Sequence, residues 1–103
     1  MIETSIKALL GFARKGNLLV SGETAVEAGL KNQQIKLLIM AEDLPSNKFN
    51  YLQKWCRDLD LPCITLGNKE ELGNALGLSP RGMIGITDEK MAAAILAKTA
   101  LEK

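Results

Sequence analysis

The sequence predicts an α/β protein: a three-layer α/β/α sandwich with a four-stranded, mainly parallel or mixed sheet and about five helices. Short apolar segments alternate along the chain with longer segments in which apolar residues recur every three or four positions. These two patterns are typical of strands and of amphipathic helices, respectively. The central run LLIMA, at residues 37–41, has no polar alternation, so we expect a strand covered on both faces. Alternating strands and helices favour a sheet with helices on both sides.

The individual elements follow from apolar spacing and from turn residues. The expected helices cover residues 2–15, 22–30, 47–59, 69–76 and 89–99. The expected strands cover residues 18–20, 35–41, 63–66 and 83–86. The expected N-caps are Thr4 or Ser5, Ser21, Ser46, Asn68, and Thr87 or Asp88. Asn68 and Glu71 match a capping box, and Gly16 and Gly77 are expected to end helices.

Length and composition favour a single cytoplasmic domain over residues 1–103. A chain of this length can bury a modest core, and its 47% hydrophobic and 24% charged residues are ordinary for globular proteins. No apolar run approaches the roughly 20 residues that cross a membrane, and the N-terminus lacks the basic start of a signal peptide. The net charge of +1 excludes a strongly basic tail but allows a local positive patch. We expect a monomer without membrane contact.

The residues needed for most enzyme chemistry are missing from the sequence. There is no histidine, so a Ser or Cys nucleophile would lack its usual base. Neither G-x-G-x-x-G nor a phosphate-binding P-loop motif is present. Cys56 and Cys63 form no metal-binding motif and are expected to be buried, reduced thiols. The sequence therefore predicts a binding module without catalytic residues, metal or cofactor.

A candidate binding surface is predicted where the second helix begins and the central strand ends. The turn Ser21-Gly22-Glu23-Thr24 presents backbone N–H groups that have no partner inside the helix. Such a helix end attracts phosphate and other anions. Glu42 and Asp43 follow the central strand and are expected to border the same surface.

Four stretches of the sequence together resemble a known family. They are Gly22 followed by a helix, IKLLIMAED at residues 35–43, LPCITLGNKEELGNALG at residues 61–77 and MIGITD at residues 83–88. In this order they resemble the kink-turn-binding ribosomal protein family, which includes large-subunit proteins seven-A-e and thirty-e. The version Leu-Val-Ser-Gly-Glu of the first turn is similar to a bacterial branch of small proteins linked with the transcription and translation apparatus. The resemblance implies binding of structured, kink-turn-like RNA and association with the ribosome or that apparatus.

The resemblance also implies which residues contact RNA. They are Ser21, Gly22, Glu23, Thr24, Lys36, Glu42, Lys69, Leu78, Arg81, Gly82 and Met83. Lys69 would bind a phosphate, and Lys36 would add longer-range electrostatic attraction for the RNA backbone. Leu78 and Met83 would pack on an extruded base, beside which Arg81 would supply charge or stacking.

Two positions depart from the family pattern. Ala25 stands where the family has a polar side chain that reads a base edge, and Ala28 stands where it has a lysine. The loss of one specific base contact commonly costs ~1–3 kcal/mol. One alternative is therefore a protein–protein interaction adaptor on the same fold. An apolar surface bordered by Glu23, Glu27 and Glu42 would favour this alternative. A small-molecule site at the strand ends is a further alternative.

Overall fold

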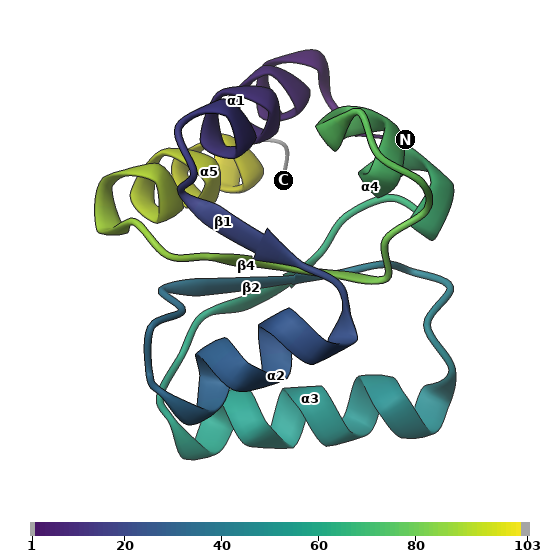
Figure 1. The fold of residues 1–103 in the computed structure, drawn as a ribbon, viewed down its shortest axis with the longest axis vertical. Coiled ribbons are helices and arrows are strands. Elements are labelled where there is room, and N and C mark those ends of the chain that lie inside the picture. Colours follow the sequence, from purple (N-terminus) through teal and green to yellow (C-terminus); the bar gives the residue numbers. More distant parts are fainter. Residues whose placement is uncertain (1, 102–103) are drawn as a thin grey trace.

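The computed structural model describes residues 2–101, which form five helices and four strands in alternating order (Figure 1). The helices are α1 (Thr4–Lys15), α2 (Glu23–Lys31), α3 (Ser46–Asp58), α4 (Lys69–Leu76) and α5 (Glu89–Leu101). The strands are β1 (Leu19–Ser21), β2 (Leu37–Met40), β3 (Cys63–Thr65) and β4 (Met83–Ile86). The predicted class and the order of the elements are confirmed, and their ends differ from the prediction by one or two residues.

The four strands form one sheet in the order β1-β4-β2-β3. β4 runs antiparallel to both of its neighbours, so that Ile86 pairs with Leu19 of β1 and with Leu37 of β2. β2 and β3 run parallel, with Ile39 opposite Ile64. The sheet is therefore mixed, as one form of the prediction had it, and the mainly parallel form is wrong. Alternation along the chain does not fix the direction in which the last strand enters the sheet.

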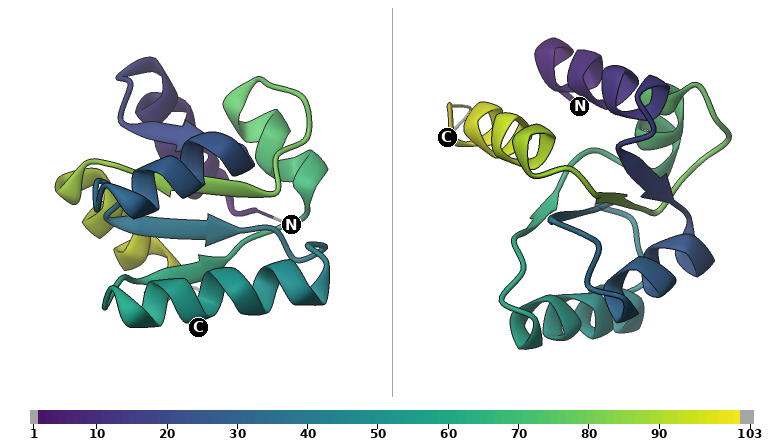
Figure 2. Two further views of the ribbon diagram at one scale, coloured as in Figure 1. Left: turned by 60° about the horizontal axis from the view of Figure 1, so that its bottom comes forward. Right: turned by 60° about the vertical axis from the view of Figure 1, so that its left-hand side comes forward.

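Helices cover both faces of the sheet and complete the three layers (Figures 1 and 2). α1, α4 and α5 lie on one face, and α2 and α3 lie on the other. β2 contributes to the buried cluster on each face because its side chains alternate. Leu37 and Ile39 belong to the cluster under α1, α4 and α5, whereas Leu38 and Met40 belong to the cluster under α2 and α3. This two-sided burial explains why the strand has no polar residue, and it confirms the prediction for LLIMA.

Three predicted helix starts are wrong by one or two residues. The N-caps are Glu3, Gly22 and Pro45 instead of Thr4 or Ser5, Ser21 and Ser46. The Glu3 carboxylate accepts the N–H of Ile6 at 3.3 Å and so takes the place expected of a hydroxyl. Ser21 lies in β1, and Ser46 is already the first residue of α3. A serine near a helix start marks the region but not the capping residue.

The other predicted helix ends are confirmed. The Asn68 side chain accepts the N–H of Glu71 at 2.8 Å, and the Glu71 carboxylate accepts the N–H of Asn68 at 3.0 Å, which completes the capping box. Asp88 accepts the N–H of Met91 at 2.9 Å at the start of α5. Gly77 ends α4 in the left-handed conformation.

Within residues 2–101, no helix combines the length and the apolar character needed to span a bilayer.

Candidate functional site

One end of the sheet gathers the residues that follow β1 and β2 and precede β4. The N–H of Gly22 donates to the Met83 carbonyl at 3.1 Å, and the N–H of Ala41 donates to the Gly82 carbonyl at 2.9 Å. Because β4 is antiparallel to β1 and β2, its start meets the ends of both strands. We call this surface the rim. It consists of Ser21, Gly22, Glu23, Thr24, Glu42, Asp43, Lys69, Arg81 and Gly82.

The N-terminus of α2 forms one side of the rim. Its N-cap, Gly22, has a φ of +90°, a conformation that strongly favours glycine, and it offers no side-chain acceptor. Among the described residues, no acceptor is found for the N–H groups of Glu23, Thr24 and Ala25. The N–H of Gly22 itself is already bonded to Met83, contrary to expectation. Three backbone donors at a helix N-terminus can receive an anion.

Lys69 is fixed at the rim by its backbone. Its N–H donates to Asp43 Oδ1 at 2.9 Å, and its carbonyl accepts the N–H of Arg81 at 3.0 Å. The capping box at Asn68 begins α4 immediately before it. Its ammonium group forms no salt bridge within the part of the chain that the structure describes. The charge of Lys69 is therefore available to an incoming anion.

Arg81 is bonded both to β1 and to the loop that carries it. Its Nε donates to Ser21 Oγ at 3.3 Å. Its Nη1 donates to Ser79 Oγ at 2.7 Å and to the carbonyls of Ser79 and Pro80 at 3.0 and 3.2 Å. The Arg81 side chain is half-buried, and its hydrogen bonds fix the loop that leads to β4. It still contributes a positive charge to the rim beside Lys69.

Lys48 partly neutralises the negative charge of two acidic residues in the first half of α2. Its Nζ lies 2.5 Å from the Glu23 carboxylate and 3.4 Å from the Glu27 carboxylate. The hydrogen bond from Lys48 lowers the pKa of Glu23, and the same bond raises the pKa of Lys48. The compensation reduces the repulsion that these acids would exert on an anion at α2. Ala25 and Ala28 are exposed on the same helix.

Three residues of the predicted site do not present their side chains at the rim. Lys36 precedes β2, and its N–H donates to the Ile86 carbonyl at 2.6 Å, at the opposite end of the sheet. Leu78 packs against the cluster under α1, α4 and α5. Met83 is only 4% exposed and lies in the cluster under α2 and α3. The Met83 side chain is buried in the core and does not offer the expected surface to an extruded base, whereas Leu78 is only partly buried.

Two residues that bond to side chains of the rim were missed by sequence reasoning. Lys48 reaches Glu23 across 25 positions, and no local pattern marks such a pair. Ser79 accepts from Arg81 two positions later, and the polar loop around Pro80 was the only local signal for it. Within residues 2–101, no group of three or more His, Cys, Asp or Glu side chains is placed to hold a metal ion.

The fold and the rim define a small α/β/α protein with a polar surface at one end of a mixed sheet. Residues 4–96 match the Ribosomal protein L7Ae/L30e/S12e/Gadd45 family, and the chain belongs to this family. The resemblance seen in the sequence is thereby confirmed.

Relatives agree with this assignment, and solved structures share the fold. The chain is 30% identical to the RNA-binding protein YlxQ of Bacillus subtilis (strain 168) over 84 residues, which cover 82% of this chain and 84% of the relative. It is 27% identical to the RNA-binding protein YlxQ of Enterococcus faecium over 84 residues, with coverage of 82% and 81%. A protein with unknown function from Bacillus halodurans C superposes with a TM-score of 0.88 at 29% identity, with coverage of 92% and 96%. The Giardia lamblia 15.5kD RNA binding protein shares the fold, with a TM-score of 0.78 at 21% identity and coverage of 94% and 85%.

Proposed function

We propose that this chain is a non-catalytic RNA-binding protein that recognises a bent or bulged, kink-turn-like RNA through the rim. We further propose that it acts with the ribosome or with the transcription and translation apparatus. One observation carries the proposal: three free amides of α2 and the two cations Lys69 and Arg81 converge on one end of the sheet. The names of the YlxQ relatives support RNA as the ligand.

The proposed contacts are mainly to the RNA backbone. One phosphate would lie at the N–H groups of Glu23, Thr24 and Ala25, where the helix dipole adds to the hydrogen bonds. Lys69 and Arg81 would each neutralise a further phosphate. With about two neutralised phosphates, affinity should fall about tenfold between about 50 mM and 200 mM salt.

Base reading should contribute less than in relatives with a polar turn. Ala25 cannot hydrogen-bond a base edge, and Ala28 cannot neutralise a phosphate. Each missing base contact costs ~1–3 kcal/mol, so recognition should depend on the shape of the RNA more than on its sequence. A kink brings phosphates of two helical segments together, and the rim offers donors from α2, α4 and the loop before β4 at one end of the sheet.

A titration of a labelled kink-turn RNA tests the proposal, with a straight duplex of matched length as control. We expect the kinked RNA to bind more tightly than the duplex at both salt concentrations. Lys69→Ala should weaken binding and lower the salt slope by about one. Lys36→Ala is the matched control, because it removes a cation from the opposite end of the sheet and should leave affinity unchanged. Equal and weak binding of both RNAs would contradict recognition of a kink.

A second candidate is a protein-interaction adaptor that uses the same surface. The exposed methyl groups of Ala25 and Ala28, next to the paired acids Glu23 and Glu27, favour it. Absence of binding to either RNA at low salt, in protein that melts cooperatively, would support the adaptor and contradict the RNA proposal.

A further inference from the structure

Two free cysteines meet between α3 and β3, at the far edge of the sheet from β1. Cys56 lies in α3, and Cys63 is the first residue of β3. We propose that they form a peroxide-sensitive dithiol, in which Cys63 is the attacking thiol and Cys56 closes an intramolecular disulfide. This modification site is independent of the proposed RNA contacts.

The loop between α3 and β3 holds the two thiols together. The N–H of Leu61 donates to the Cys56 carbonyl at 2.8 Å, and the Pro62 carbonyl accepts the N–H of Leu38 at 3.0 Å. Both cysteines pack in the cluster under α2 and α3, and seven positions of the chain separate them. A short loop therefore joins the two thiols within one buried cluster, and a disulfide between them requires no movement of a distant segment.

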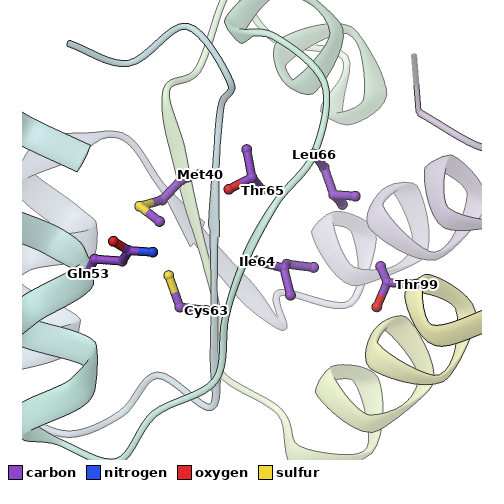
Figure 3. Close-up of a pocket in the computed structure, with 7 residues that line it drawn as sticks. All are labelled: Met40, Gln53, Cys63, Ile64, Thr65, Leu66 and Thr99. Atoms are coloured by element: carbon purple, nitrogen blue, oxygen red, sulfur yellow. The ribbon is translucent and has the colours of Figure 1, made fainter. Parts of the chain in front are cut away.

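The two thiols differ in access. Cys56 is only 1% exposed, whereas Cys63 is half-buried and lines a cavity of about 510 Å³. Figure 3 shows the Cys63 sulfur directed into this cavity, on the same side as Gln53 and the Met40 sulfur. The cavity is large enough for a small oxidant such as hydrogen peroxide to reach Cys63.

The two thiols also differ in acidity. The Cys56 thiol stabilises the thiolate of Cys63 and lowers the pKa of Cys63. Interaction with the Cys63 thiolate, together with burial, raises the pKa of Cys56. Because the thiolate is the nucleophile, oxidation should begin at Cys63.

The proposed reaction has two balanced steps. The Cys63 thiolate attacks one oxygen of hydrogen peroxide, an S–O bond forms as the O–O bond breaks, and hydroxide leaves, so that sulfur is oxidised to sulfenic acid and peroxide is reduced. Cys56 sulfur then attacks the Cys63 sulfur. The S–S bond forms as the S–O bond breaks, and the proton of Cys56 leaves with the hydroxyl group as water. Oxidation removes the Cys63 thiolate, which was the main cause of the raised pKa of Cys56.

Trypsin separates the two cysteines and makes the test direct. Cleavage after Lys54, Arg57 and Lys69 places Cys56 in peptide 55–57 and Cys63 in peptide 58–69. After brief peroxide treatment of the native protein, we expect these peptides to be recovered joined by a disulfide in monomeric protein. Cys56→Ala should trap the sulfenic acid, so that dimedone labels peptide 58–69.

The wild-type chain supplies a second measurement in case a variant does not fold. In native protein, maleimide should label peptide 58–69 at least about tenfold faster than peptide 55–57, because exposure and thiolate character control reactivity. In guanidinium the two rates should become similar. Faster labelling of peptide 55–57, disulfides only between chains, or two thiols that survive a peroxide dose that oxidises the unfolded chain would overturn the proposal.

Discussion

Gly73→Ala should destabilise the protein although it replaces glycine by alanine inside a helix. Gly73 lies in α4, where a Cβ would stand 2.3 Å from the Ser79 carbonyl oxygen and 2.8 Å from Pro80 Cα. Both are backbone atoms, so no side-chain rotation can relieve the clash. The loop that leads to Arg81 and β4 would have to move away from α4.

The magnitude follows from two opposing effects. Alanine gains about 1 kcal/mol over glycine in a helix interior. Overpacking typically costs ~1–3 kcal/mol, and a clash with fixed backbone belongs to the upper part of that range. The free energy of unfolding should therefore fall by about 1–2 kcal/mol, and at about 4–8 °C per kcal/mol for a domain of this size the melting temperature should fall by about 5–15 °C.

Gly11→Ala is the matched control for this experiment. Gly11 also lies within a helix, α1, and the nearest atom to its Cβ would be the Ala75 carbonyl oxygen at an ordinary 3.9 Å. This variant should gain about 0.5–1 kcal/mol from helix propensity alone. Thermal and urea unfolding of both variants give the comparison. If Gly73→Ala is stabilised as much as Gly11→Ala, the reasoning about the packed loop is refuted.

Three further perturbations address the rim and its supports. Arg81→Ala should weaken RNA binding and also lower the free energy of unfolding by about 1 kcal/mol, since its hydrogen bonds to two serines are lost; RNA titration and urea unfolding check both. Asn68→Ala should cost about 1 kcal/mol through the lost cap, whereas Asn74→Ala, on the exposed face of α4, should not. By NMR titration Glu23 should have a pKa below its ordinary 4.5, and Lys48→Met should raise that pKa. Because the folded pKa is lowered, any stabilisation from this pair is present above 4.5 and lost as the pH falls through the folded value.

Features encoded by neighbouring residues could be predicted from the sequence. The capping box of Asn68 and Glu71 needs residues only three positions apart, and the two-sided burial of β2 is visible in five consecutive apolar residues. The helix starts at Gly22 and Pro45 were missed, because a nearby serine is the usual cap and only the backbone path shows which residue takes that position.

The candidate site was harder to predict because it is built from distant segments. The pairing of Lys48 with Glu23 and the bond from Arg81 to Ser21 both join elements far apart in the chain. The direction of β4 was also not determined by the sequence pattern. It decides that Arg81 and Gly82, which precede β4, meet the ends of β1 and β2 at the rim. The candidate residues could be listed from the sequence. The topology was needed to decide which of them lie together at the rim.

The central position of β4 has a consequence for how the protein is made. In the described sheet, the neighbour of β1 is β4. Leu19 therefore cannot form its strand pairing until Ile86 has been synthesised. During synthesis, β2 and β3 can pair early, whereas β1 and the start of α2 remain without their sheet partner until nearly the whole chain has emerged. The rim can therefore form only late in synthesis, once β4 has emerged. A nascent chain that lacks β4 would have Lys69 but would lack the sheet that brings it to the same surface as Gly22, so ligand binding would require synthesis through β4.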